Sequence, residues 1–180
     1  MAMRLAQLAL AVLLSAATVS ASAQMAATAP AAEMQHKTIA PSTSLTLVLN
    51  GKTTTLTLAQ IAALPHKSVT VFNLHEKKNE TYSGISLAAL LTANGAPFDK
   101  TTQHTMLHSY ILASGTDGYG VIYSTVEVFP DFHTGDVIVA DSMDGKPLAE
   151  DGLKLISSED KHPMRWVHSL TSITLTQPAN

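Results

Sequence analysis

Arg165 and Trp166 form the residue pair with the clearest chemical potential in this sequence. Arg165 is one of two arginines, the other being Arg4, and it adjoins the single tryptophan of the chain. A guanidinium binds oxyanions through two parallel hydrogen bonds, and an adjacent ring shields such a contact from water. The pair therefore predicts an anion-binding site. The alternative is a structural role, in which the aliphatic stem of Arg165 covers the core while Trp166 packs inside.

Two histidines, His104 and His108, lie four residues apart. This spacing places two imidazoles on one face of a helix, where they can bind zinc or copper. The segment from Met106 to Ala113 favours a strand, however, and no third ligand is evident in the sequence nearby. A metal site at this pair is therefore kept as an alternative.

Five further residues are candidates for binding a ligand. His75 follows a predicted strand, and Asp117 and Tyr119 occupy a tight turn between two others. Tyr123 ends the strand after that turn. Asp141 ends another predicted strand. Each of these residues also fits an ordinary turn or strand-end role. No catalytic residue is assigned, because the sequence contains neither a Gly-x-Ser-x-Gly elbow nor a glycine-rich phosphate loop.

Composition narrows the classes of function. The 180 residues contain no cysteine, so disulfides, cysteine-ligated zinc and iron–sulfur clusters are excluded. The 14 acidic residues outnumber the 11 basic ones, which gives a net charge of −3. No stretch is basic enough to grip a phosphate backbone, so nucleic acid is not an expected partner.

The first 23 residues predict a cleaved Sec-type signal peptide and hence a periplasmic or secreted protein. Arg4 supplies the positive end, Leu8 to Leu14 is apolar, and Ala21-Ser22-Ala23 fits the cleavage rule. The apolar run is too short to span a bilayer, and no membrane span is expected in the mature chain. Residues 24–43 are rich in Ala, Pro, Ser and Thr and predict a flexible leader, in which scattered Met and His side chains are weak copper ligands.

Residues 44–177 predict one α+β domain with mixed β-sheets and short helices. Asn50-Gly51 indicates a hairpin, Thr57 with Gln60 and Ser124 with Glu127 indicate capping boxes, and Asn94-Gly95 ends a helix that begins at Ser86. The predicted strands show no regular alternation with helices, which argues against a doubly wound sheet. They are residues 44–49, 52–56, 68–74, 80–83, 106–113, 119–123, 137–140, 153–157 and 172–176.

Several ordered motifs resemble the molybdopterin-binding domain of the sulfite oxidase type. They are Tyr82-Ser83-Gly84-Ile85-Ser86-Leu87 with Leu90-Leu91, the Gly115–Tyr119 turn, Val137–Leu148 and Arg165-Trp166-Val167. The resemblance extends from Leu45 to Leu175 and implies that family's fold, a molybdopterin cofactor and a pterin cleft bordered by the Asp117 turn. It also implies a cysteine metal ligand at the end of the strand before Tyr82. In this chain that strand ends Phe72-Asn73-Leu74-His75.

The lack of a thiol separates this sequence from the catalytic members that it resembles. We expect an exported domain of their fold that binds a ligand or serves as an accessory protein, without a cysteine-ligated molybdenum centre. The expected ligand is small and anionic or pterin-like. One alternative is a redox enzyme that holds a pterin non-covalently beside Arg165, His75 and Tyr119. The other is a periplasmic metal-binding module that uses His104 and His108.

Overall fold

The computed structural model describes residues 39–98 and 101–178. The predicted signal peptide and most of the predicted leader, including Met25, Met34 and His36, lie outside the described residues. The last residues of the predicted leader are packed on the domain, because the hydroxyl of Ser42 donates to the carbonyl of Asp151 at 3.0 Å and accepts from the N–H of Leu153 at 2.9 Å.

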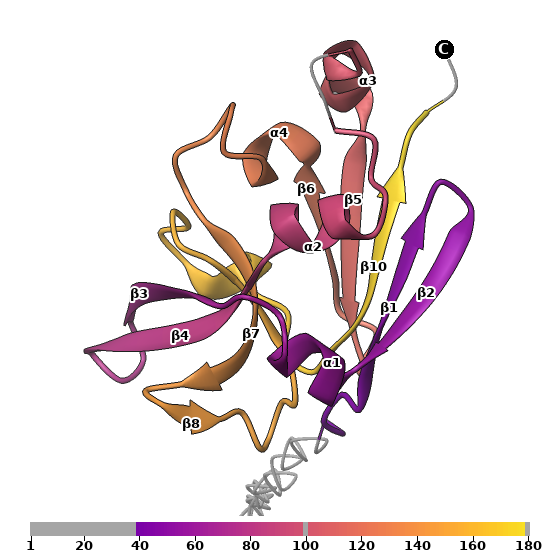
Figure 1. Cartoon of the computed structure of the whole chain (residues 1–180). Coiled ribbons are helices and arrows are strands. Elements are labelled where there is room, and N and C mark those ends of the chain that lie inside the picture. The colour runs from indigo at the N-terminus through magenta and orange to yellow at the C-terminus, as the bar shows by residue number, and fades with distance from the viewer. Residues whose placement is uncertain (1–38, 99–100, 179–180) are drawn as a thin grey trace, which may run out of the picture. The chain divides into compact units, whose positions relative to one another are not determined.

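The first of two five-stranded sheets holds the two ends of the described domain together. Strand β1 pairs in parallel with β10, and the other pairs in this sheet are antiparallel. Figure 1 shows this sheet beside the second one. Its strand order is β2 (Lys52–Thr57), β1 (Ser44–Leu49), β10 (Leu170–Thr176), β5 (Tyr110–Gly115) and β6 (Gly120–Ser124).

The second sheet is antiparallel throughout. Strand β7 is its hub, since it pairs with β4 on one side and with β8 and β9 at different parts of the other. The strands are β3 (Lys67–Asn73), β4 (Lys78–Ser86), β7 (Val137–Met143), β8 (Lys146–Pro147) and β9 (Lys154–Ser157).

The helices are short and fill the ends of the sheets. Helix α1 contacts β2 and β7, and α2 contacts β4 and β7, so both lie where the two sheets approach each other (Figure 1). No helix among residues 39–98 and 101–178 is long and apolar enough to cross a membrane. The helices are α1 (Leu58–Ala62), α2 (Leu87–Ala93), α3 (Gln103–His108), α4 (Thr125–Val128) and the 3₁₀ helix η1 (Pro163–Arg165).

The second sheet is apolar on both faces. Along β7, Val139 belongs to the larger core, which draws on both sheets and on all four α-helices, whereas Ile138 and Ala140 belong to a smaller cluster. This alternation follows from the two-residue period of a strand. The smaller cluster is completed by side chains from β3, β4 and β9 and by Trp166, which follows η1. Trp166 is buried and its indole N–H donates to the carbonyl of Ser157 at 3.1 Å.

The predicted α+β fold with mixed sheets and short helices is confirmed, and several local signals act as expected. Asn50 and Gly51 have φ of 51° and 76° in the β1–β2 turn, as a two-residue hairpin requires. Both capping boxes are present, at Thr57 and at Ser124. Gly95 has a φ of 91° where α2 ends.

The predicted strand from Met106 to Ala113 is wrong in its first half. Residues Gln103–His108 form α3, and β5 begins only at Tyr110. Met106 and the residue after it are good helix formers, and Met106 alone anchors the helix in the core at 3% exposure. The hydroxyl of Ser109 then donates to the carbonyl of Thr105, which closes the last turn.

The close packing of β4 on β7 requires glycine at position 84. A Cβ at this position would lie 2.0 Å from the carbonyl oxygen of Val139 and 2.5 Å from the Cα of Ala140. The pairing of β4 with β7 shifts register between Ser83 and Gly84, so the two backbones approach closely at this bulge. Only glycine fits without moving one strand away from the other.

We predict that Gly84→Ala lowers the free energy of unfolding by about 2–3 kcal/mol, because the added methyl overpacks the contact between two strand backbones. Urea unfolding of both variants measures the difference. Gly120→Ala is the matched control, since its Cβ would meet nothing closer than a serine hydroxyl at 3.3 Å, and it should change stability much less. Equal effects of the two substitutions would contradict this reading of Gly84.

Candidate functional site

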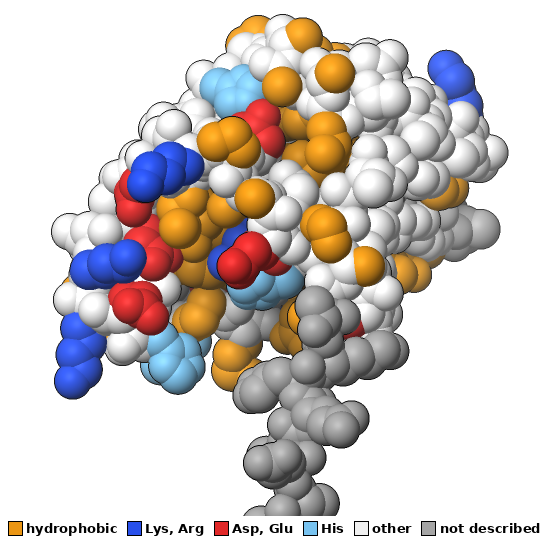
Figure 2. Space-filling view, turned by 90° about the horizontal axis from the view of Figure 1, so that it is seen from below, with side chains coloured by type: hydrophobic (Ala, Val, Ile, Leu, Met, Phe, Trp, Pro, Cys, Tyr) orange, Lys and Arg blue, Asp and Glu red, His pale blue; other side chains and the backbone are white. Residues whose placement is uncertain are grey.

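A polar pocket of about 870 Å³ lies on the second sheet and is here called the lysine pocket. The view from below in Figure 2 shows acidic, basic and histidine side chains around hydrophobic ones on this side of the domain. The lysine pocket is lined by Asn73, Glu76, Lys78, Glu80, Tyr82, Met143, Asp144, Lys146, Pro147, Leu148, Ala149, Glu150, Asp151, Lys154 and His168.

Lys154 is the most unusual residue of the lysine pocket because it is a charged residue in a buried strand. It opens β9 and is only 7% exposed. Its register partner on β7 is Ala140, whose own partner on β4 is Gly84. Because side chains alternate along a strand, Lys154 shares the face of Ile156, which belongs to the smaller apolar cluster. Lys154 thus places an amine at a buried position of the sheet, where an apolar side chain is usual.

The Nζ atom of Lys154 is held mainly by aromatic faces. It lies 5.2 Å from the ring centre of Tyr82 and 5.6 Å from that of Trp166, and the two rings meet edge to face. Its hydrogen bond to the hydroxyl of Tyr82 is long, at 3.4 Å. That hydroxyl donates to Glu80 at 2.9 Å. A desolvated ammonium is stabilised by ring faces, but much less than by a paired carboxylate.

Burial is the largest single influence on the pKa of Lys154, Tyr82 and Asp151. Desolvation lowers the pKa of Lys154 below its ordinary 10.5, although the charges of Asp151 and Glu80 oppose that effect. Desolvation, together with the hydrogen bond to Glu80, raises the pKa of Tyr82, which keeps its hydroxyl protonated. For Asp151 burial alone would raise the pKa, but the contact with His168 at 3.0 Å, the charge of Lys154 and a backbone hydrogen bond from Ser169 together outweigh burial and lower it.

The charge around the lysine pocket is net acidic. Five carboxylate residues line it against three lysines and one histidine. Glu80 is the most buried of them, at 3% exposure, and it accepts from the side-chain amide of Asn73 at 2.9 Å. The oxygen of the same amide accepts from the backbone N–H groups of His75 and Glu76. Asn73 therefore has both ends of its side chain occupied by the protein itself.

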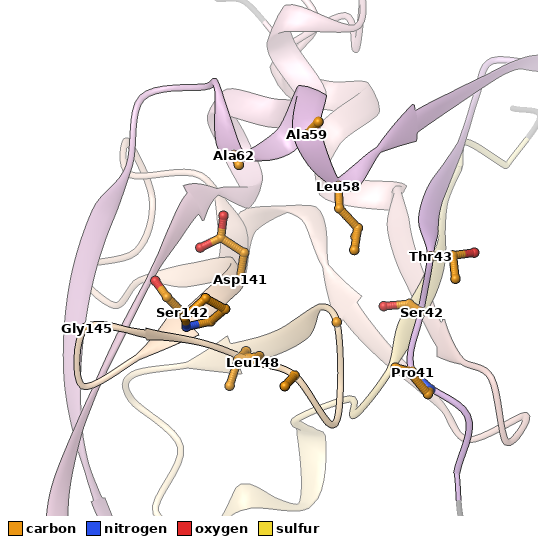
Figure 3. A pocket seen from close by; sticks show the side chains of 13 residues that line it. Pro41, Ser42, Thr43, Leu58, Ala59, Ala62, Asp141, Ser142, Gly145 and Leu148 are labelled. Atoms are coloured by element: carbon orange, nitrogen blue, oxygen red, sulfur yellow. The ribbon is translucent and has the colours of Figure 1, made fainter.

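A second pocket, of about 660 Å³, is largely apolar and shares the β8 segment as a wall with the lysine pocket. Figure 3 shows that its side chains come from the segment before β1, from α1 and from the β7–β8 hairpin. Asp141 is its one charged residue, and its Oδ2 lies 2.9 Å from Nε2 of His66. This pair ties the loop after α1 to β7.

Arg165, Tyr119 and Tyr123 come together at η1, outside both pockets. The guanidinium of Arg165 donates to Asp160 at 3.2 and 2.5 Å and to Glu127 at 2.9 Å, and it stacks 4.6 Å from the ring centre of Tyr123. Tyr123 donates its hydroxyl to the carbonyl of Arg165 at 2.8 Å. Tyr119 donates its hydroxyl to the backbone carbonyl of Met164. Both tyrosine hydroxyls are therefore hydrogen-bonded to backbone carbonyls of η1. This arrangement matches the structural alternative for Arg165.

The other predicted residues lie apart from this cluster. Asp117 accepts from the N–H of Tyr119 at 2.9 Å, as expected for a tight turn. His75 is exposed in the β3–β4 turn and lines neither pocket. His104 and His108 are exposed on α3 at the helical spacing of four. Among the described residues no group of three metal-ligating side chains includes them. Their roles as ligand or metal sites stay predictions.

Comparison with known proteins supports the fold. No family model matches the chain, and no curated protein matches its sequence. Among solved structures, the sulfane dehydrogenase SoxCD from Paracoccus pantotrophus is similar, with a TM-score of 0.57 and 16% sequence identity. The fold is shared. The match covers 76% of this chain but only 38% of the SoxCD chain. At this identity the likeness extends to architecture and not to activity.

The residues present do not fit the molybdopterin centre that the sequence resemblance implies. Molybdenum in that fold takes a soft thiolate, and the chain has no cysteine. The amide of Asn73, at the end of the corresponding strand, is occupied by Glu80 and by backbone groups. A pterin phosphate requires cationic partners, whereas Arg165 is neutralised by its own carboxylates and the lysine pocket is net acidic.

Sequence reasoning missed Lys154, Glu80 and Tyr82 as site residues. A signal was present, because Lys154 interrupts the apolar run from Leu153 to Ile156 in a segment that was predicted to be a strand. Glu80 and Tyr82 are two residues apart and hence share one face of β4. What the sequence does not show is that β4 and β9 both pair with β7, so that Tyr82 and Lys154 meet on one face of the sheet.

We predict that Arg165→Ala lowers the free energy of unfolding by about 1–2 kcal/mol, since the side chain is partly exposed but joins two carboxylates and a ring. High salt should shrink this difference because it screens the ion pairs. Lys161→Ala, four residues away and exposed, is the control and should be nearly neutral. An unchanged stability in the Arg165 variant would contradict the structural role.

We predict that the contact between His66 and Asp141 stabilises the fold only at low pH. The hydrogen bond to Asp141 raises the pKa of His66 above 6.5, so its contribution is complete below 6.5 and is lost as pH rises through the higher, folded-state pKa. Urea unfolding of wild type and Asp141→Asn, measured from about pH 5 to about pH 8.5, should converge at the alkaline end. A pH-independent gap, or one that widens with pH, would contradict this assignment. His66→Gln should reproduce the Asn variant.

Proposed function

We propose that this chain is an exported ligand-binding or accessory protein that has the molybdopterin-oxidoreductase fold without a cysteine-ligated molybdenum centre. The ligand site is the lysine pocket. The predicted Sec-type signal peptide agrees with the same proposal, because a chain that crosses the membrane unfolded cannot carry a cofactor loaded beforehand. The single observation that carries the proposal is the absence of any thiol in a fold whose metal is held by one.

The contents of the lysine pocket support binding over redox chemistry. Its buried amine offers three donors, of which one long hydrogen bond to Tyr82 is used within the described domain. A pocket with an apolar wall and a few convergent polar groups is the usual form of a small-molecule site. The sequence predicted an anionic or pterin-like ligand. The surplus of carboxylates favours a ligand with little net negative charge.

The two alternatives have weaker support. A redox enzyme with a non-covalent pterin requires His75, Tyr119 and Arg165 around one substrate, yet His75 is in the β3–β4 turn while Arg165 is bound to Glu127 and Asp160. A metal-binding module has the exposed pair His104 and His108 on α3 in its favour. Within the described part of the chain that pair has no third ligand.

Metal and pterin analysis of protein purified from the periplasm of its native host tests the proposal. We expect molybdenum far below one atom per chain, no pterin fluorescence after acid oxidation and a mature chain that begins at Gln24. Intact mass reads the last of these directly. Molybdenum and pterin in equimolar amount would overturn the proposed absence of a metal centre, and a retained N-terminal segment would overturn cleavage. A matched preparation of a molybdoenzyme from the same host shows that the cofactor survives purification.

A further inference from the structure

Lys154 has the surroundings of a nucleophilic amine. Its Nζ contacts two ring faces and one hydroxyl, and among the described residues no carboxylate oxygen lies within 4.0 Å of it. We propose that Lys154 binds a small, uncharged aldehyde or ketone in the lysine pocket as a reversible imine. This inference rests on the proposed function, since it names the ligand class and the binding mode of the same site.

Two other lysines of the second sheet differ from Lys154 in solvent exposure and in pairing with a carboxylate. Lys78 lines the same pocket but is 53% exposed and lies 3.8 Å from Glu80. Lys67, on β3, is 51% exposed and is paired with Asp136 at 2.5 Å. Water and a paired carboxylate both keep an amine protonated and therefore unreactive toward a carbonyl carbon. Of these three lysines, only Lys154 is both shielded from water and without a paired carboxylate.

The groups that face Nζ provide a route for its proton. The hydroxyl of Tyr82 accepts from Nζ and donates to Glu80, so a proton can pass from the ammonium to the tyrosine oxygen while the tyrosine proton passes to the carboxylate. Asp151, from the loop before β9, is the other carboxylate whose charge acts on Lys154, and it is hydrogen-bonded to His168, from the loop before β10. Desolvation by the surrounding core lowers the pKa of Lys154, in agreement with this geometry.

Imine formation at this site requires no oxidant or metal. The lone pair of neutral Nζ attacks the carbonyl carbon, the C=O π bond breaks as the C–N bond forms, and one Nζ proton passes to the oxygen to give a carbinolamine. The carbinolamine hydroxyl then takes up a proton and leaves as water, and the iminium nitrogen that remains keeps its last proton or returns it to the solvent. Hydrolysis reverses these steps and releases the ligand.

The lining of the lysine pocket sets the ligand class. Met143, Pro147 and Leu148 give the pocket an apolar part, which suits an alkyl or aryl substituent. Glu150 and Asp151 add negative charge to the same lining, so a keto acid is repelled where an uncharged carbonyl compound is not. The carbonyl itself is the group that the amine recognises.

Reductive trapping tests the inference with propanal as the probe. The full mature protein is treated with limiting propanal and cyanoborohydride at neutral pH, and the alkylated lysines are mapped by peptide mass spectrometry. We expect labelling of Lys154 to exceed that of the exposed lysines by about tenfold for each unit by which its pKa is the lower. Glyoxylate, an anionic aldehyde, should show a smaller preference for Lys154.

The wild-type labelling map decides the outcome, because burial alone would make Lys154 the slowest lysine. Labelling in proportion to exposure, with Lys154 last, would overturn the imine and leave the molybdenum measurement unaffected. Tyr82→Phe keeps the ring and removes the hydroxyl, so it should slow labelling of Lys154 several-fold and leave Lys67 unchanged. Lys154→Arg should abolish the preferred site, and melting curves show whether both variants are folded.

Discussion

The close approach of β4 and β7 at Gly84 is the constraint on which the second sheet depends. The absence of a side chain lets the two backbones meet at the bulge, and the register on the far side of β7 then places Ala140 opposite Lys154. Tyr82 and Glu80, on the same strand as Gly84, are thereby set on the face that Lys154 also occupies. Gly84 thus permits the strand pairing through which β4 and β9 bring a phenol, a carboxyl group and an amine to one pocket.

The burial of a lysine is costly, and the surroundings of Lys154 show how the cost is limited. Ring faces of Tyr82 and Trp166 partly replace the lost water, and Glu80 and Asp151 supply opposite charge from a distance. These contacts leave N–H donors of the amine without a hydrogen-bond acceptor among the described residues. A fully structural lysine would be expected to reach water or to pair with a carboxylate, as Lys67 does. The unused donors of Lys154 are the feature on which the proposed binding function rests.

Local signals in the sequence predicted the elements well, whereas the site depended on long-range contacts. The hairpin turn at Asn50-Gly51 and the capping box of Thr57 with Gln60 each depend on residues close together in the sequence, and both were predicted. Arg165 was predicted as a binding residue because it is one of two arginines, yet its side chain is held by Asp160 and by Glu127, which is 38 residues away along the chain. The lysine pocket combines side chains from β3, β4, β7, β8 and β9, and no short motif encodes that combination.

Nuclear magnetic resonance titration of the lysine side chains tests the central claim that Lys154 is a desolvated, unpaired amine. With lysine labelled in ¹³C and ¹⁵N, and Lys154→Arg used to assign the signal, each ammonium reports its own pKa. We predict that Lys154 titrates at a lower pH than every exposed lysine, since burial outweighs the attraction of Asp151 and Glu80. A titration together with the exposed lysines, or above them, would contradict the account and make Lys154 an ordinary ion-paired residue.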